Sequence, residues 1–279
     1  MDRRDFFKKT AGVGAAILLV PEIIEMDRRN FFKKTAGAGA ATLLIPEIIE
    51  AAIPEKVSSG GYQGHSFSKG ETILFQGDSI TDWRRNKGEE NNANTQSQLG
   101  SGYVLFTAAS ILANYANKDL KIYNRGVGGN KVSQLYERWD KDCIDLRPNL
   151  LSILIGINDF WHTKSIGYNG TFVTYETDYR KLLERTKKNL PELKIVICEP
   201  FFIYGGSALD DTWEADFADY RKVAQTLAND FKLTFVPFQS VFNEALKKAP
   251  ASYWGEDGIH PSMAGAQLMA QAWLKAAIG

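Results

Sequence analysis

The stretch "ILFQGDSITDW" (residues 73–83) runs from a buried strand straight into a polar turn. Residues 73–76 suit the interior of a sheet, and Gly77, Asp78 and Ser79 follow with no spacer. Glycine permits a tight backbone, and a strand-to-helix turn can expose a serine hydroxyl above the sheet edge. The stretch therefore predicts a nucleophile at the end of a strand, provided that the chain also supplies a base and donors for an oxyanion.

The chain beyond this stretch alternates between short apolar runs and segments with helical periodicity. Strands are expected at residues 72–76, 121–124, 150–155, 194–199 and 234–237. Helices are expected at residues 103–117, 131–143, 174–189, 213–230, 240–248 and 262–278. This alternation predicts one α/β domain with a parallel sheet covered on both faces. Ligands bind such sheets outside the carboxyl ends of the strands, so the loops after the first three strands should meet there.

The composition argues against several classes of partner and cofactor. The 279 residues include 33 basic and 33 acidic residues, which gives a formal net charge of zero. Nucleic-acid binding needs a basic face, so no nucleic-acid partner is expected. The two cysteines, Cys143 and Cys198, lack the spacing of metal ligands, and Cys198 lies in an apolar run that predicts a buried free thiol. No metal and no cofactor is expected.

The first fifty residues are a tandem repeat. Residues 1–25, "MDRRDFFKKTAGVGAAILLVPEIIE", are followed by "MDRRNFFKKTAGAGAATLLIPEIIE" at 26–50. Each copy has a charged head and an apolar run shorter than the roughly 20 residues that span a bilayer. The pattern is typical of an export signal, and the double arginine with an aromatic residue and lysine resembles the twin-arginine signal. An amphipathic helix on a membrane surface is the alternative interpretation.

These features divide the chain into three parts. Residues 1–50 are interpreted as a duplicated signal segment, 51–69 as a linker and 70–279 as the catalytic domain. We therefore expect an exported protein, periplasmic or secreted, with no stable membrane span.

A base for Ser79 must come from one of three histidines, His65, His162 or His260. His260 lies in "WGEDGIHPSMAG" (254–265), three residues after Asp257. A loop with this spacing can bring the carboxylate to the imidazole Nδ1 and leave Nε2 facing a serine. The alternative is that Asp257 caps a turn and His260 lies in a surface loop.

Donors for an oxyanion are available after the second and third predicted strands. Gly129 in "RGVGGN" (125–130) offers a backbone N–H, and Asn158 in "GINDFW" (156–161) offers a side-chain amide. The glycine-rich loop does not have the spacing of a phosphate-binding loop. Asparagine is common in turns, so Asn158 alone is a weak signal. Its combination with Ser79 and a terminal D-x-x-H motif is specific.

Four motifs resemble, in order, the four blocks of the SGNH (GDSL-type) hydrolases. They are "GDSITD", the Gly of "NRGVGGN", the Asn of "GINDFW" and the Asp and His of "DGIHPS". The resemblance covers residues 70–279. It implies a three-layer α/β/α flavodoxin-like domain with a five-stranded parallel sheet and a metal-free esterase mechanism. The implied site is a triad of Ser79, Asp257 and His260 and an oxyanion hole of Ser79, Gly129 and Asn158.

Longer stretches, including "NRGVGGNKVSQLYERWDKDCI" and "IHPSMAGAQLMAQAWL", are similar to SGNH acetylxylan esterases. Those enzymes deacetylate xylo-oligosaccharides and can form ring-like oligomers. The similarity implies a serine esterase for O-acetyl esters of carbohydrates, with acetylated xylan or xylo-oligosaccharides as substrate, and a homo-oligomer. One alternative is a lysophospholipase or thioesterase of the same superfamily. Another is a non-catalytic carbohydrate-binding protein on the same scaffold.

Several residues near these motifs are candidates for binding the substrate. Flat aromatic rings beside polar groups suit stacking on sugar faces. The candidates are Asp78, Trp83, Trp161 and Trp254. The polar insert at 84–102 is too long for a simple turn, and we expect it to rim the site, contact a neighbouring subunit or form a mobile loop.

Overall fold

The apolar runs after residue 70 pair into one sheet. The structure is a computed structural model that describes residues 44–54, 64–210 and 212–279. The strands are β1 (Thr72–Gly77), β2 (Lys121–Asn124), β3 (Leu150–Leu154), β4 (Lys194–Cys198) and β5 (Thr234–Val236). All neighbours are parallel, and the order is β2-β1-β3-β4-β5. Each strand predicted from the sequence is found, with its ends shifted by no more than one residue.

The strand order places a crevice beside β1. The chain passes from β1 outward to β2 and then returns to the other side of β1 to form β3. Such a reversal separates the loops that leave the two central strands, which is where open parallel sheets bind ligands. The last residue of β1, Gly77, pairs with Leu154 of β3, so the loops after these strands begin side by side.

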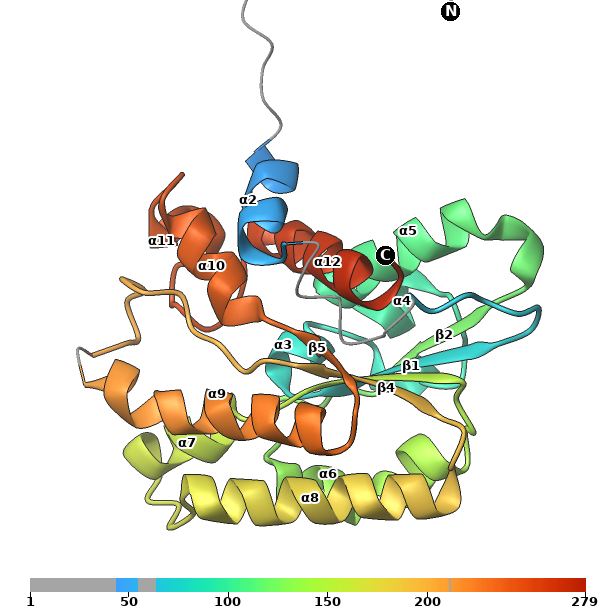
Figure 1. Ribbon diagram of the computed structural model, residues 1–279, viewed down its shortest axis with the longest axis horizontal. Coiled ribbons are helices and arrows are strands. Elements are labelled where there is room, and N and C mark those ends of the chain that lie inside the picture. Colours follow the sequence, from blue (N-terminus) through green and yellow to red (C-terminus); the bar gives the residue numbers. More distant parts are fainter. Residues whose placement is uncertain (1–43, 55–63, 211) are drawn as a thin grey trace, which may run out of the picture. The chain divides into compact units, whose positions relative to one another are not determined.

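Helices cover both faces of the sheet (Figure 1). One layer contains α6 (Val132–Glu137), α7 (Ile157–Ser165), α8 (Phe172–Asn189) and α9 (Trp213–Asp230). The other contains α5 (Tyr103–Asn114), α10 (Phe238–Leu246), α12 (Met263–Ala277) and the more peripheral α2 (Leu44–Ala52). The expected three-layer α/β/α architecture is confirmed.

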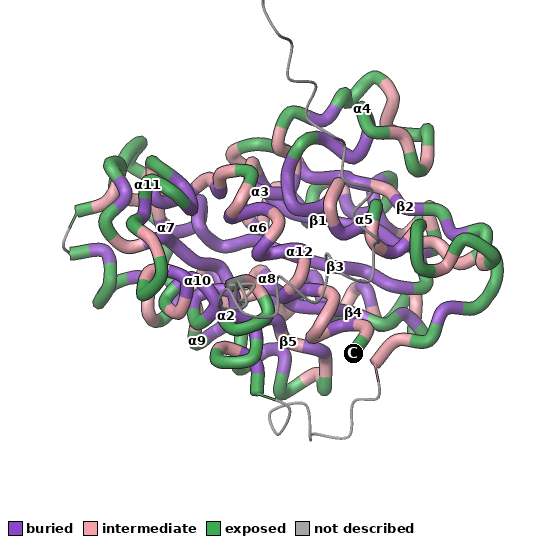
Figure 2. Tube along the Cα trace, turned by 90° about the horizontal axis from the view of Figure 1, so that it is seen from above, coloured by how far each residue is buried: buried purple, intermediate pink, exposed green. Residues whose placement is uncertain are grey.

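The interior of the sheet is apolar, as the uninterrupted strand runs predict. All five residues of β3 are buried, and the strands form the buried centre of the trace in Figure 2. Two large buried indoles also have hydrogen-bond partners: Trp139 Nε1 donates to Thr186 Oγ1 and Trp273 Nε1 to Ser152 Oγ, both at 2.9 Å. These partners remove the cost of burying an unpaired N–H.

Some helices differ from the expected boundaries. The predicted helix at 131–143 is split into α6 and a π-helical turn, Asp140–Ile144. Helix α7 was not expected. The insert at 84–102 is also structured, since it contains a 3-10 turn, Lys87–Glu89, and the short helix α4 (Gln96–Leu99). Helices of one turn are too short to show an apolar period, which is why the sequence did not predict them.

The helix α2 changes the boundary of the folded domain. The chain forms two compact units, Met1–Thr42 and Leu43–Gly279, so α2 is part of the same unit as the sheet. Ile48, Ile49 and Ile53 are buried where α2 packs against α10 and α12. The sequence pattern places residues 44–50 in the signal segment, because hydrophobicity alone does not distinguish packing on a domain from insertion into a membrane. The rest of that segment, residues 1–43, lies outside the described residues.

Candidate active site

The turn after β1 explains why this strand ends on glycine, aspartate and serine. A side chain at Gly77 would collide with the carbonyl oxygen of Leu154 on β3, so the close approach of the strands requires glycine. Asp78 is the N-cap of the next helix, α3 (Ser79–Asp82), and its carboxylate accepts a backbone N–H of the first turn at 3.0 Å. Ser79 is the first helical residue, so strand, cap and helix together fix its position.

Hydrogen bonds join Ser79, His260 and Asp257 in series. Ser79 Oγ lies 2.8 Å from His260 Nε2, and His260 Nδ1 lies 2.7 Å from Asp257 Oδ2. Asp257 Oδ1 also accepts the backbone N–H groups of His260 at 2.7 Å and Ile259 at 2.9 Å. A carboxylate facing Nδ1 favours the tautomer with hydrogen on that nitrogen, which leaves Nε2 free to accept the Ser79 hydroxyl proton.

The loop that carries Asp257 and His260 is held by the loop that follows β4. Ile203 N–H donates to the Gly258 carbonyl at 2.7 Å, and Ala208 N–H donates to the Asp257 carbonyl at 3.1 Å. The last motif of the chain is therefore attached to the sheet through backbone hydrogen bonds, which fix the histidine relative to the serine after β1.

The hydrogen bonds around Asp257 stabilise its charged form. Partial burial alone would raise the pKa of this carboxyl. The hydrogen bonds from the His260 ring and from the N–H groups of His260 and Ile259, with the attraction of His260, outweigh burial and lower the pKa to about 2. Asp257 is therefore an anion throughout the neutral range and can stabilise a protonated His260.

The loop that carries the expected oxyanion donor Gly129 passes next to Ser79, and Asn158 is bonded to the same loop. A Cβ built on Gly128 would be 3.8 Å from Ser79 Cβ, so the loop after β2 passes next to the serine. Gly129 has a φ of +78°, a conformation that favours glycine. Asn158, in the first turn of α7, is 3% exposed, and its Nδ2 donates to the Asn130 carbonyl at 3.1 Å. A primary amide has two N–H bonds, so the second remains for a ligand.

One of the three tryptophans expected to bind substrate contacts the candidate triad. The ring of Trp83 stacks on the imidazole of His260, with centroids 5.1 Å apart and planes inclined by 26°. Trp161 is partly buried against the core and packs on Trp213 at 6.1 Å. The expectation for Trp254 was wrong: this residue is 2% exposed, and its Nε1 donates to a carbonyl of α10 at 3.0 Å. Trp254 is a core residue with a satisfied N–H.

Asp78 is also not a substrate ligand, because it is 1% exposed and caps α3. Burial raises its pKa to about 7, although the Ile80 N–H and the charge of His260 act in the opposite direction. Burial likewise raises the pKa of Asp159, which is 3% exposed, to about 7. Asp159 Oδ1 accepts the Val132 N–H at 3.2 Å and so holds the start of α6.

Two acids were missed in the sequence: Asp82 contacts the glycine-rich loop and Asp159 contacts the start of the helix that follows it. Asp82 Oδ2 accepts the Gly128 N–H at 2.9 Å, and Asp159 accepts the Val132 N–H. Both belong to the quoted motifs: Asp82 is the last residue of "GDSITD", three residues beyond Ser79, and Asp159 follows Asn158. The spacing of one helical turn was the available signal for Asp82.

Two further features are absent from the described residues. Among them, no group of three or more His, Cys, Asp or Glu side chains could hold a metal ion. Within these same residues, no helix has the length and apolar character needed to cross a membrane. Cys143 and Cys198 are buried and free of disulfides, as expected for Cys198.

Comparisons with known proteins agree with the motifs. Residues 75–268 match the GDSL-like Lipase/Acylhydrolase family. An acetylxylan esterase of Geobacillus stearothermophilus is 34% identical over 211 residues, which cover 74% of this chain and 93% of the relative. A solved GDSL-like lipase from Parabacteroides merdae is 52% identical with a TM-score of 0.75, covering 76% of this chain and 97% of the other.

The solved acetylxylan esterase Axe2 of Geobacillus stearothermophilus is 32% identical with a TM-score of 0.69, covering 76% of this chain and 96% of the other. Catalytic mutants of Axe2 carry alanine in place of a serine, an aspartate or a histidine. That aspartate and histidine are three residues apart, the spacing of Asp257 and His260 here. The chain belongs to the GDSL-like lipase/acylhydrolase family, and it is a carboxylic ester hydrolase.

Proposed function

We propose that this protein is a serine esterase that removes acetyl groups from carbohydrates, with acetylated xylan or xylo-oligosaccharides as its substrate. The observation that carries the proposal is the series of hydrogen bonds from Asp257 through His260 to Ser79, at 2.7 and 2.8 Å. The similarity to acetylxylan esterases supports the acetyl group and the sugar.

The first half of the proposed reaction acylates Ser79. Its Oγ attacks the carbonyl carbon of the acetyl ester while His260 Nε2 takes the hydroxyl proton. Asp257, with a pKa of about 2, stays ionised and stabilises the imidazolium. The ring of Trp83, stacked on the imidazole, restricts rotation of His260.

The carbonyl oxygen becomes an oxyanion during this attack. The backbone N–H groups of Ser79 and Gly129 and the Asn158 amide are its donors, and fixed donors of this kind stabilise charge that develops in the transition state. His260 then gives its proton to the sugar oxygen as the C–O bond breaks, which leaves an acetyl group on Ser79. A water molecule, activated by His260, repeats the sequence and releases acetate.

The acyl preference and the role of Ser79 are tested together. We expect the full chain to hydrolyse 4-nitrophenyl acetate faster than the longer esters up to dodecanoate, and to release acetate from acetylated xylan. Ser79→Ala should lower kcat by on the order of 10⁴-fold or more with an unchanged melting temperature. Ser101→Ala, which alters an exposed serine of the insert, is the matched control and should retain full activity.

Each other outcome points to one of the alternatives. A preference for long acyl chains that still depends on Ser79 would move the substrate to lysophospholipids or acyl thioesters. Binding of xylo-oligosaccharides without any hydrolysis would indicate a carbohydrate-binding protein. Unchanged turnover in Ser79→Ala would overturn the proposed mechanism.

A further inference from the structure

The loop after β2, residues 126–130, carries a proposed oxyanion donor but has few side chains to hold it in place. We propose that Asp82 is a positioning residue that fixes this oxyanion loop, through the hydrogen bond from the Gly128 N–H to its carboxylate. The inference rests on the proposed function, because it concerns the N–H of Gly129 as a donor to the oxyanion.

Packing alone does not hold Gly129. A Cβ built at this position would meet nothing within 4 Å, and the φ of +78° lies in a region that glycine enters at little cost. Gly128 precedes Gly129, so two successive residues lack a Cβ that would restrict the backbone. The direction of the Gly129 N–H must therefore be set by hydrogen bonds of the neighbouring residues.

On the far side of Gly129, two hydrogen bonds restrain the chain. The Asn130 carbonyl accepts from the Asn158 amide at 3.1 Å, and the Val132 N–H donates to Asp159 at 3.2 Å. On the near side, the Gly128 N–H donates to Asp82 Oδ2 at 2.9 Å. The backbone also restrains the loop, since the Val127 N–H donates to the Gly77 carbonyl at 3.0 Å and the Asn130 N–H to the Val127 carbonyl at 3.2 Å. The Asp82 contact is the side-chain hydrogen bond to the residue that precedes Gly129.

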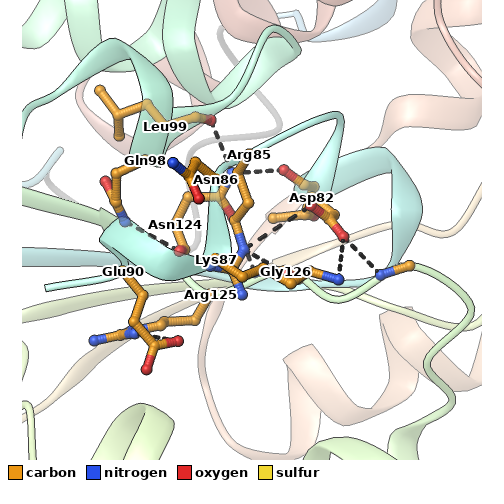
Figure 3. Close-up of polar contacts among 12 residues, drawn as sticks. Asp82, Arg85, Asn86, Lys87, Glu90, Gln98, Leu99, Asn124, Arg125 and Gly126 are labelled. Atoms are coloured by element: carbon orange, nitrogen blue, oxygen red, sulfur yellow. Dashed lines mark hydrogen bonds and ion pairs between the residues drawn. The ribbon is translucent and has the colours of Figure 1, made fainter.

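Asp82 is in turn well placed to hold the loop. It is the last residue of α3, one turn beyond Ser79, so one short helix carries both the nucleophile and this acceptor. Its Oδ2 lies 3.1 Å from Lys87 Nζ, and its Oδ1 lies 4.0 Å from Arg85 Nε (Figure 3). Arg85 Nε also donates to the Gly126 carbonyl at 2.7 Å. The carboxylate and the loop are therefore joined by shared partners.

These partners show what the polar insert contributes. Arg85 and Lys87 come from the insert, and so does Glu90, which pairs with the buried Arg125 at 2.8 Å. Gln98 Nε2 donates to the Asn124 carbonyl at 3.0 Å just before the loop. The insert thus supports the base of the oxyanion loop at several points, as the contacts in Figure 3 show.

The expected effect of losing this acceptor is on kcat. Asp82→Ala removes the carboxylate that accepts the Gly128 N–H. The Gly129 N–H should then be displaced from the oxyanion, and kcat should fall by about 10- to 100-fold. The KM for 4-nitrophenyl acetate should stay within about twofold, because the oxyanion exists only after attack. Asp82→Asn keeps an oxygen that can accept the Gly128 N–H, so it should recover kcat to within about threefold of the wild type.

The measurement compares full chains of the wild type, Asp82→Ala, Asp82→Asn and the control Asp145→Ala. Asp145→Ala removes an exposed carboxylate that has no contact with this network, so its kcat should be unchanged. Affinity for methylboronic acid is the second readout. This acid adds to Ser79 Oγ and becomes a tetrahedral anion, so its Kd in Asp82→Ala should rise by the factor by which kcat falls. If Asp82→Ala does not fold, Asp82→Ser replaces it with the same expectation.

Failure of this inference differs from failure of the proposed function. An inactive Ser79→Ala together with an Asp82→Ala of wild-type kcat would overturn the role of Asp82 and leave the esterase mechanism intact. An Asp82→Asn as impaired as Asp82→Ala would also overturn it, because the charge and not the acceptor would then matter. An active Ser79→Ala would instead contradict the proposed function itself.

Discussion

Asp257 contacts His260, and Asp78 precedes Ser79 in the chain. The pKa values of these two carboxyl groups nevertheless shift in opposite directions. Burial opposes ionisation at both positions. Asp257 has several hydrogen bonds from N–H groups of its own loop, and its pKa falls to about 2. Asp78 accepts the Ile80 N–H with one oxygen, while the other is buried without a partner, and its pKa rises to about 7. Asp78 is also more deeply buried than Asp257, so depth of burial and number of donors together decide which acid remains charged.

The raised pKa of Asp78 predicts a dependence of stability on pH. Between its ordinary value of 3.8 and about 7, the folded protein holds a proton that the unfolded chain has lost. The free energy of unfolding therefore falls as pH rises through this interval and stays reduced above it. Asp78→Asn keeps the oxygen that caps α3 but has no charge to bury. We expect it to raise the melting temperature at pH 8 and leave it nearly unchanged at pH 4.

Thermal unfolding from pH 4 to pH 8 measures this effect. Asp159 and Glu199, whose pKa values burial also raises to about 7, contribute to the same slope, so Asp78→Asn should remove only part of it. Asp145→Asn, which alters an exposed acid, is the control. An Asp78→Asn slope equal to that of the wild type would contradict the assignment of a buried, neutral Asp78. Asp257 affects stability in the opposite sense. Its contribution to the free energy of unfolding is present above pH 3.8 and is lost as the pH falls through about 2.

Single residues with a defined chemical role were the most predictable part of the site. Ser79, His260 and Asp257 could be predicted because their chemistry requires particular side chains at particular spacings. The burial of Asp78 and Trp254 could not be predicted, because the sequence does not show whether an acid or an indole in a motif faces the substrate or the core. Asp82 was missed because its partner is a backbone N–H that lies 46 residues further along the chain, although its spacing of one helical turn from Ser79 was visible in the sequence.

At the scale of elements, α2 is the clearest departure from the expectation. The helix contributes the buried Ile48 and Ile49, and the buried Ile53 follows its end; full burial of one such side chain stabilises by roughly 1.5–3 kcal/mol. Its ion pairs, Lys248–Glu47 and Lys275–Glu50, are exposed and add little. We expect a protein cut before Leu43 to keep the stability of the full chain. A protein cut after Pro54 should be less stable by several kcal/mol.

Urea unfolding of the two truncated proteins measures the difference. Ile53→Arg in the longer one is the matched variant, because it replaces one buried isoleucine with a charged side chain and leaves α2 in place. This substitution should cause part of the loss of stability that removal of α2 causes. Equal stability of both truncated proteins would show that α2 does not contribute to the domain.

The remaining elements divide by length. The helices α8, α9 and α12 were predicted within two residues of their ends because each is long enough to show an apolar period. The short α3, α4 and α11 (Ala251–Trp254) were not predicted, and neither was the π-helical turn after α6. These pieces are formed by caps and by contacts with distant segments, such as the Asn124 amide, which donates to the Leu99 carbonyl at 2.9 Å.

At the scale of the whole molecule, the strand order accounts for the site. Ser79 follows β1 and Asn158 follows β3, the two strands that flank the reversal in the sheet, while Gly129 follows β2 on the other side of β1. The alternation of strands and helices predicts a parallel sheet but not its order, which depends on packing between distant elements. The resemblance implied a flavodoxin-like sheet, and the order itself is a finding of the structure. The export role of the N-terminal repeat stays a prediction, since most of it lies outside the described residues.

The central claim is that turnover passes through an acetyl group on Ser79. Its most direct test is mass spectrometry of the full chain, quenched in acid during hydrolysis of 4-nitrophenyl acetate. The predicted result is one added acetyl group on the peptide that contains Ser79, and none in the Ser79→Ala variant. The mechanism would be contradicted by an unmodified chain under conditions where acetylation is faster than deacetylation. It would also be contradicted by an acetyl group present at the same level in Ser79→Ala.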